Sequence, residues 1–218
     1  MHHLTSVFAG ALLLASCKSQ IDDKPAAAVK DAKSKTDGGV AKAGVSSDAK
    51  PAVGGKGLAV DAAASTIGFV GAKVTDDHEG KFTDFTGDVA IEGDAVKSIA
   101  LTVKTQSIDV EPQKLEDHLR SADFFDVEKF PSATFESSSI TEKADGANTH
   151  VIEGTLDLHG VAKTISFPAK ITVDKGQATG HAEFTINRKD FGIVYAGMPD
   201  DLIKDSVLLK IDLKIPRS

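Results

Sequence analysis

The clearest pattern in the chain is an alternation of apolar and polar residues with a period of two, repeated in several segments after about residue 57. Successive side chains of a β-strand point to opposite faces of the sheet, so this alternation predicts strands with one buried face. The pattern predicts about eight strands, at 67–69, 89–91, 99–103, 134–140, 152–158, 165–173, 182–186 and 207–215.

Turn signals separate these runs and favour an antiparallel arrangement. Glycine-containing segments at 92–94, 143–148, 159–160 and 175–176 are typical of hairpins and short loops. An antiparallel sheet of this size tends to curl and close, because closure removes its exposed edges. We therefore expect an all-β fold, an eight-stranded antiparallel barrel. Pro168 interrupts one run and predicts a bulged or locally unpaired position.

One segment departs from the alternation. Residues 111–120 (EPQKLEDHLR) predict a short helix, with Leu115 and Leu119 four residues apart on one face. A Phe-rich stretch at 123–131 follows. The helix and this stretch would lie across an open barrel end, either lining the mouth of a ligand site or plugging the barrel and completing its core.

An eight-stranded barrel has room for a packed core or for one small ligand. An apolar interior does not distinguish the two, since every core is apolar. In the ligand-binding interpretation, His118 and Arg120 beside the mouth would meet a polar head group, whereas otherwise they are solvated or pair with neighbours. The expected apolar cavity and mouth residues are Phe69, Ile91, Leu101, Val103, Leu115, Leu119, Phe124, Phe125, Phe135, Leu156, Phe167 and Phe184.

Composition argues against several other functions. The 218 residues carry a net charge of −7, whereas nucleic-acid binding relies on Lys and Arg, so no nucleic-acid partner is expected. The seven His residues show no metal-ligand spacing and there is one Cys, so we expect neither a metal nor a cofactor. No nucleophile elbow or phosphate-binding loop is present. An enzyme is therefore not expected.

The N-terminus indicates export. The apolar run at 7–14 is too short to span a bilayer but suits a signal peptide. It ends in Leu14-Ala15-Ser16-Cys17, which resembles the lipobox of bacterial lipoproteins; the alternative is a short leader with a chance Cys. We expect a signal peptide at 1–16, a lipid on Cys17 and a lipid-anchored protein on the periplasmic side of the cell envelope. Lys18 favours the outer membrane.

The residues that follow predict a flexible connection. Residues 17–56 are rich in Ala, Lys, Asp, Gly and Ser and nearly lack large apolar side chains. Such a segment buries too little surface to offset its ordering entropy, so we expect a disordered tether. The folded domain is expected at 57–218, and its length is ample for one core.

The folded part resembles a known family. The stretch 118–135 (HLRSADFFDVEKFPSATF) is similar to the signature of the YceI-like family, and other family landmarks follow in order over roughly 57–215. These landmarks are 82–87 (FTDFTG), 99–108 (IALTVKTQSI), 154–163 (GTLDLHGVAK) and 188–192 (RKDFG).

The resemblance implies a lipocalin-like barrel with a long apolar cavity for a polyisoprenoid or related amphiphile in the periplasm. We therefore expect a membrane-anchored lipid-binding protein that carries, stores or scavenges a polyisoprenoid-like lipid. Two alternatives remain: a filled barrel that recognises an envelope protein, and a lipid-modifying enzyme. A homodimer is one option for its assembly.

Overall fold

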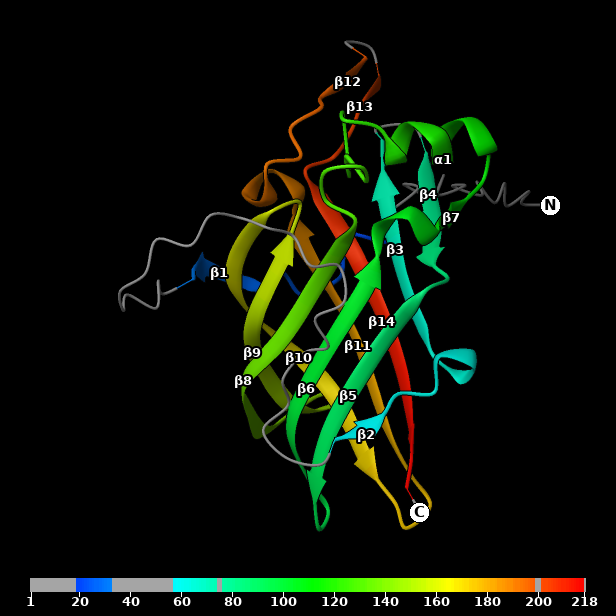
Figure 1. The fold of residues 1–218 in the computed structure, drawn as a ribbon. Helices are drawn as coiled ribbons and strands as arrows, with labels where there is room; N and C mark the ends of the chain where they lie inside the picture. The colour runs from blue at the N-terminus through cyan, green and yellow to red at the C-terminus, as the bar shows by residue number, and fades with distance from the viewer. Residues whose placement is uncertain (1–18, 33–56, 74–75, 199–200, 218) are drawn as a thin grey trace, which may run out of the picture.

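The computed structural model describes residues 19–32, 57–73, 76–198 and 201–217. Most of them form one curled antiparallel sheet (Figure 1). Its long strands lie side by side and match the predicted runs. In sheet order they are β5 (Phe85–Glu92), β6 (Ala95–Lys104), β8 (Ser132–Asp145), β9 (Asn148–Leu158), β10 (Val161–Val173), β11 (Gln177–Asn187), β14 (Ser206–Pro216) and β3 (Thr66–Ala72).

Shorter strands extend this sheet at its margins. β4 (Asp77–Phe82) pairs with β3, and β7 (Ile108–Val110) pairs with β4. β2 (Leu58–Ala59) pairs with β5, and the next residues bridge β5 and β14. The amide of Val60 donates to the carbonyl of Gly87 on β5 at 2.9 Å, and the amide of Asp61 donates to the carbonyl of Lys214 on β14 at 2.8 Å. This short segment therefore links two strands that are not neighbours in the sheet order.

Helical elements lie mainly at one end. The predicted short helix is confirmed as α1 (Gln113–Arg120), preceded directly by Pro112, and Figure 1 places it beside the hairpin of β12 (Gly197–Met198) and β13 (Asp201–Leu202). Three short 3-10 turns connect strands: η1 (Ala62–Ala64), η2 (Thr105–Ser107) and η3 (Arg188–Phe191). Across the described residues, we find no helix with the length and apolar character needed to span a membrane.

The core occupies the inside of the curl. The inward residues of the predicted alternation are buried together; on β10 these are Ile165, Phe167, Ala169 and Ile171. Pro168 pairs with β9, but no pairing joins it to a strand on its other side, as the sequence predicts for a residue without an amide hydrogen.

The expectation of a disordered tether at 17–56 is wrong for its described part, residues 19–32. β1 (Ala28–Asp31) pairs with β10 over residues 163–166, where β10 is not paired with β11. Strand edges need hydrogen-bond partners, and this segment supplies them. Ile21 and Val29 also provide apolar contacts. Cys17 and residues 33–56 lie outside the described residues.

Candidate functional site

The barrel is hollow at the end that carries α1. A cavity of about 200 Å³ lies there, and its wall comes from strands, from α1 and from the loop between η3 and β14. Nine of the predicted binding residues line it: Phe69, Leu101, Val103, Leu115, Leu119, Phe124, Phe125, Phe135 and Leu156. The interpretation of α1 as part of a mouth therefore agrees with the geometry.

A second cavity of about 90 Å³ lies deeper in the barrel. Phe167 and Phe184, two further predicted residues, line it. Both cavities share Leu101, Phe135 and Leu156 in their walls, so they follow one another along the barrel. Ile91 lines neither cavity; it is partly buried against the core.

Two glycines keep aromatic rings against the wall of the larger cavity. A Cβ on Gly80 would lie 2.5 Å from Cζ of Phe69, and a Cβ on Gly154 would lie 2.5 Å from Cζ of Phe135. Each ring therefore occupies the space above a glycine of the neighbouring strand. Because the rings lie there, they narrow the lumen less than they would if they pointed inward.

The mouth is framed by α1 on one side and the loop 193–203 on the other. The edge of His118 on α1 meets the rings of Phe124 and Tyr195, at centroid distances of 5.0 and 5.1 Å. Phe124 and Tyr195 also contact each other at 5.3 Å. This aromatic cluster joins helix and loop, and it explains why His118 does not line the cavity.

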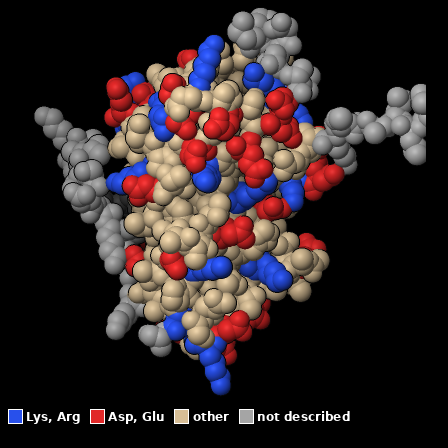
Figure 2. Space-filling model, turned by 90° about the vertical axis from the view of Figure 1, so that its right-hand side faces the viewer, with Lys and Arg blue, Asp and Glu red and all other residues tan. Residues whose placement is uncertain are grey.

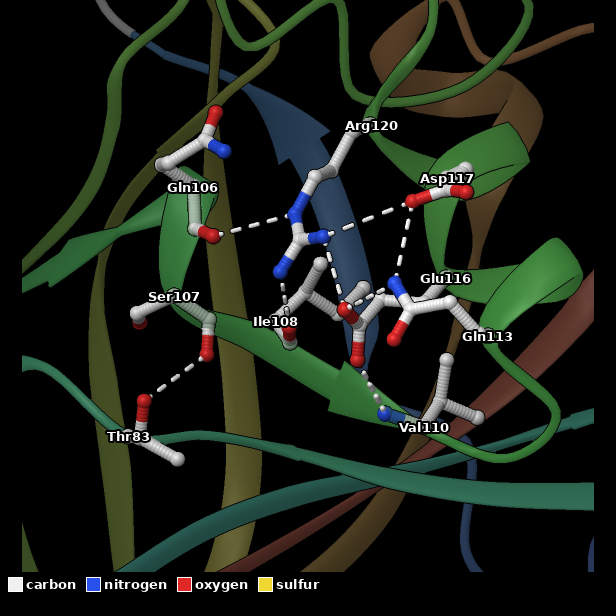
Figure 3. Close-up of polar contacts among 9 residues, drawn as sticks. All are labelled: Thr83, Gln106, Ser107, Ile108, Val110, Gln113, Glu116, Asp117 and Arg120. Carbon is white, nitrogen blue, oxygen red and sulfur yellow. Dashed lines mark hydrogen bonds and ion pairs between the residues drawn. The ribbon is translucent and has the colours of Figure 1, made fainter.

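Arg120 connects α1 to the barrel through hydrogen bonds (Figure 3). Its guanidinium donates to the carbonyls of Gln106 and Ile108 at 3.1 and 2.9 Å, and to a carboxylate oxygen of Glu116 at 2.7 Å. Glu116 also accepts from the side chain of Gln113 at 2.8 Å and from the amide of Val110 at 3.2 Å. The predicted head-group residue Arg120 thus holds the helix and does not line the cavity.

The same contacts affect the acidity of Glu116. The hydrogen bond from Gln113 is the largest influence that lowers the pKa of Glu116, followed by the hydrogen bond from the amide of Val110. Arg120 lowers this pKa further, and desolvation opposes the shift. The ionised carboxylate is therefore the form that holds α1 in place.

Lys73, His78 and Arg188 also border the cavity, although the surface exposed to it is apolar. The described lining contains no carboxylate. None of these three residues was among the predicted binding residues. For Arg188 the available signal was its place in the family landmark 188–192, whereas His78 lies in β4, a strand outside the predicted runs.

Arg188 is only 4% exposed and its bonds hold the loop that frames the mouth. It donates to the carbonyl of Ile193 at 2.8 Å, to that of Lys204 at 3.1 Å and to that of Ile203 at 3.4 Å. It also contacts the carboxylate of Asp205 at 3.3 Å. Burial lowers the pKa of Arg188, and the charge of Asp205 opposes that shift. A guanidinium stays protonated in proteins, and here its charge is directed at backbone carbonyls and at Asp205, while the surface exposed to the cavity is apolar.

This barrel, with its apolar lumen and its mouth beside α1, has relatives among known proteins. The family profile described as "YceI-like domain" matches residues 58–215. The chain belongs to the YceI-like family. The match begins at β2, so the N-terminal segment and β1 lie outside it.

Relatives of this YceI-like chain include UPF0312 proteins of two organisms. One from Pseudomonas aeruginosa is 34% identical over 122 residues, which is 52% of this chain and 62% of the relative. One from Shewanella baltica is 39% identical over 127 residues, which is 52% of this chain and 63% of the relative. The matches thus span less than two thirds of these relatives' length.

Solved structures share the fold. Burkholderia cenocepacia BcnA has a TM-score of 0.63 and 26% identity, and the match covers 71% of this chain and 98% of that one. A polyisoprenoid binding domain from Saccharophagus degradans has a TM-score of 0.60 and 16% identity, and covers 74% and 98%. At that identity the second likeness concerns the fold alone. The expected lipocalin-like, mostly antiparallel β architecture is confirmed, with short strands added to the expected number.

Proposed function

We propose that this YceI-like protein binds an elongated apolar or amphiphilic lipid, of the polyisoprenoid type, inside its barrel. The observation that carries the proposal is the larger cavity, whose exposed wall is apolar and which is bordered by α1. The name of the Saccharophagus degradans neighbour, a polyisoprenoid binding domain, supports this ligand class.

The two cavities suit a long chain better than a compact ligand. They follow one another along the barrel and share lining residues. A prenyl chain gains roughly 25 cal/mol for each Å² of apolar surface removed from water. Extension from the larger cavity into the smaller one therefore increases affinity with chain length, provided that the aromatic side chains between them move aside.

The wall indicates which part of a ligand it holds. Lys73, His78 and Arg188 border the larger cavity, but the surface exposed to it is apolar. Such a wall favours the hydrocarbon chain of an amphiphile, whose polar head group would stay at the mouth.

A direct test measures ligands on the purified full chain. Native mass spectrometry followed by organic extraction should detect a prenyl compound bound one to one, or uptake of an added prenyl phosphate or prenyl quinone. Phe125→Asp should abolish uptake, because it places a charge in the lining, whereas Lys143→Asp, at an exposed position of β8, should not. A mass that stays free of ligand at saturating lipid would refute the proposal and favour the filled-barrel interaction module.

We also propose that Cys17 carries a lipid that holds the protein on the periplasmic side of the cell envelope. The lipobox-like Leu14-Ala15-Ser16-Cys17 supports this. Cys17→Ser should move the protein from the membrane fraction to the soluble fraction. Retention of the variant on the membrane would contradict the anchor without affecting the ligand test.

A further inference from the structure

The described N-terminal segment begins at the rim of the larger cavity. The hydroxyl of Ser19 donates to the carboxylate of Asp77, with its oxygen 2.8 and 2.9 Å from the two carboxylate oxygens. The amide of Gln20 donates to the same carboxylate at 3.0 Å. Asp77 opens β4 and is followed by His78, which lines the cavity. These bonds therefore fix Ser19 at the mouth end of the barrel.

An apolar contact strengthens this attachment. Ile21 is 4% exposed and packs on the outside of the barrel against Val70, Ala72 and Leu208. Ala72 belongs to the cavity lining as well. Removing Ile21 from this site would expose it and uncover three neighbours, so burial here stabilises the docked position.

The rest of the segment follows the barrel wall near the same end. Lys204 donates to Asp22 at 2.9 Å, and Lys24 forms an ion pair with Glu183. The amide of Ala27 donates to the carbonyl of Thr185 at 2.8 Å, after which β1 pairs with β10. Contacts at several points hold the segment against the barrel rather than away from it.

This docking makes the link to Cys17 short. Cys17 stands only two residues before Ser19. Two residues span at most about 7 Å, since a fully extended chain covers 3.3 to 3.6 Å per residue. A lipid on Cys17 is therefore confined to the neighbourhood of the cavity mouth.

Exposed apolar side chains occupy the same end. Among the described residues, the large hydrophobic side chains that remain exposed are Val194, at 65%, and Leu202, at 49%. Both stand in the loop 193–203, whose end residues Ile193 and Ile203 line the cavity. Single exposed apolar residues are ordinary, but a pair on one loop at the mouth favours an apolar contact surface.

We infer that the docked segment orients the barrel so that its cavity mouth faces the bilayer, with Val194 and Leu202 in contact with the lipid surface. The inference rests on the proposed lipid on Cys17 and on the proposed ligand. Figure 2 shows acidic and basic side chains interspersed on the side of the barrel over α1 and β4. At the mouth end, shallow burial of Val194 and Leu202 is the contact that we infer. A lipid ligand would then pass between bilayer and cavity without crossing water.

The chain contains no Trp, which allows a single-Trp reporter at either end. Val194→Trp places the reporter at the mouth, and Lys175→Trp places it in the exposed turn between β10 and β11 at the opposite end. The full chain is coupled through Cys17 to maleimide-phosphatidylethanolamine in phosphatidylcholine vesicles, with or without brominated phosphatidylcholine as quencher. We expect loss of emission for Val194→Trp and none for Lys175→Trp. Equal quenching at both ends would overturn the orientation.

A second pair of variants tests the docked segment itself. Ile21→Asp should release the segment, so that quenching of the Val194→Trp reporter falls to the level at the opposite end while the circular dichroism of the barrel is retained. Ala28→Asp adds the same charge at an exposed position of the same segment, on β1, and should leave the quenching unchanged. Unchanged quenching in Ile21→Asp would show that the segment does not orient the barrel.

The coupling chemistry separates this inference from the proposed function. Because maleimide attaches the lipid in vitro, orientation is measured whether or not Cys17 is lipidated in the cell. Prenyl-phosphate uptake by the same vesicle-bound protein is recorded in parallel. Loss of uptake with the mouth still facing lipid would contradict the proposed ligand, and uptake without orientation would contradict only this inference.

Discussion

The two ends of the barrel are built from the same alternating strands but differ in how they use their aromatic residues. In the deeper half, the rings of Phe167 and Phe184 stack with centroids 4.0 Å apart and an interplanar angle of 12°, beside a cavity of about 90 Å³. At the mouth, Phe82 and Phe125 meet edge to face at 5.7 Å, and the cavity is about 200 Å³. Close packing stabilises the first end, while the open space at the second end is where we propose that a ligand binds.

The largest expected effect comes from breaking the packed end. Phe184 is 1% exposed, and Phe184→Ala removes a stacked ring from the core. We expect a loss of about 3–5 kcal/mol in the free energy of unfolding, measured by urea denaturation. Phe125→Ala, at the partly buried mouth, is the matched variant and should cost clearly less. Equal losses at both positions would mean that the mouth is a packed plug.

The next effect concerns the loop at the mouth. Arg188→Met leaves the carbonyls of Ile193 and Lys204 without their donor, so we expect a loss of about 1–3 kcal/mol in stability and faster amide exchange in the loop 193–203. The neighbouring Lys189→Met removes only a half-exposed ion pair with Asp205 and should cost less than about 1 kcal/mol. Similar exchange rates in both variants would contradict the role of Arg188.

A smaller effect is expected from a steric change that narrows the lumen at the mouth end without altering its charge. Gly80→Ala places a Cβ where the ring of Phe69 lies, so the ring has to move toward the lumen. We expect reduced uptake of a prenyl quinone, with the longest chains affected most, and a modest loss of stability. Gly176→Ala, in the exposed turn between β10 and β11, is the control, because a Cβ there meets no atom within 4 Å. Unchanged uptake in Gly80→Ala would show that Phe69 does not limit the lumen.

The sequence could predict the strands and α1 because their signals are local. Period-two alternation and the spacing of Leu115 and Leu119 need only neighbouring residues. The strand β1 could not be predicted in this way: its four residues include only one large apolar side chain, Val29, and pair with an edge that β10 and β11 leave open. The pairing of β1 with this edge joins residues more than 130 positions apart along the chain, such as Asp31 and Lys163.

The character of the site was also only partly predictable. Leu101 and Phe167 stand in equally regular alternations, and nothing in the pattern says that the first lines both cavities and the second only the deeper one. His118 and Arg120 share the mouth helix, but their side chains bond to the protein. Arg188 is held at the cavity by bonds from its guanidinium to Ile193 and Asp205, which stand 5 and 17 residues later in the chain. No local sequence pattern reveals these contacts.

The smallest expected effect is a pH dependence confined to the mouth. Hydrogen bonds from Gln113 and Val110 lower the pKa of Glu116 in the folded protein, so its ionised form stabilises the docking of α1. This contribution is fully present above the pKa of the unfolded chain and is lost as the pH falls through the lower, folded pKa. Amide exchange in α1 should therefore accelerate in acid before exchange in β11 does.

Glu116→Gln should weaken the docking already at neutral pH and reduce the acid response of α1. Asp117→Asn is the control, since Asp117 is more exposed and lies 3.8 Å from Arg120 in a looser pair. An acid response of α1 that persists in Glu116→Gln would assign it to another group.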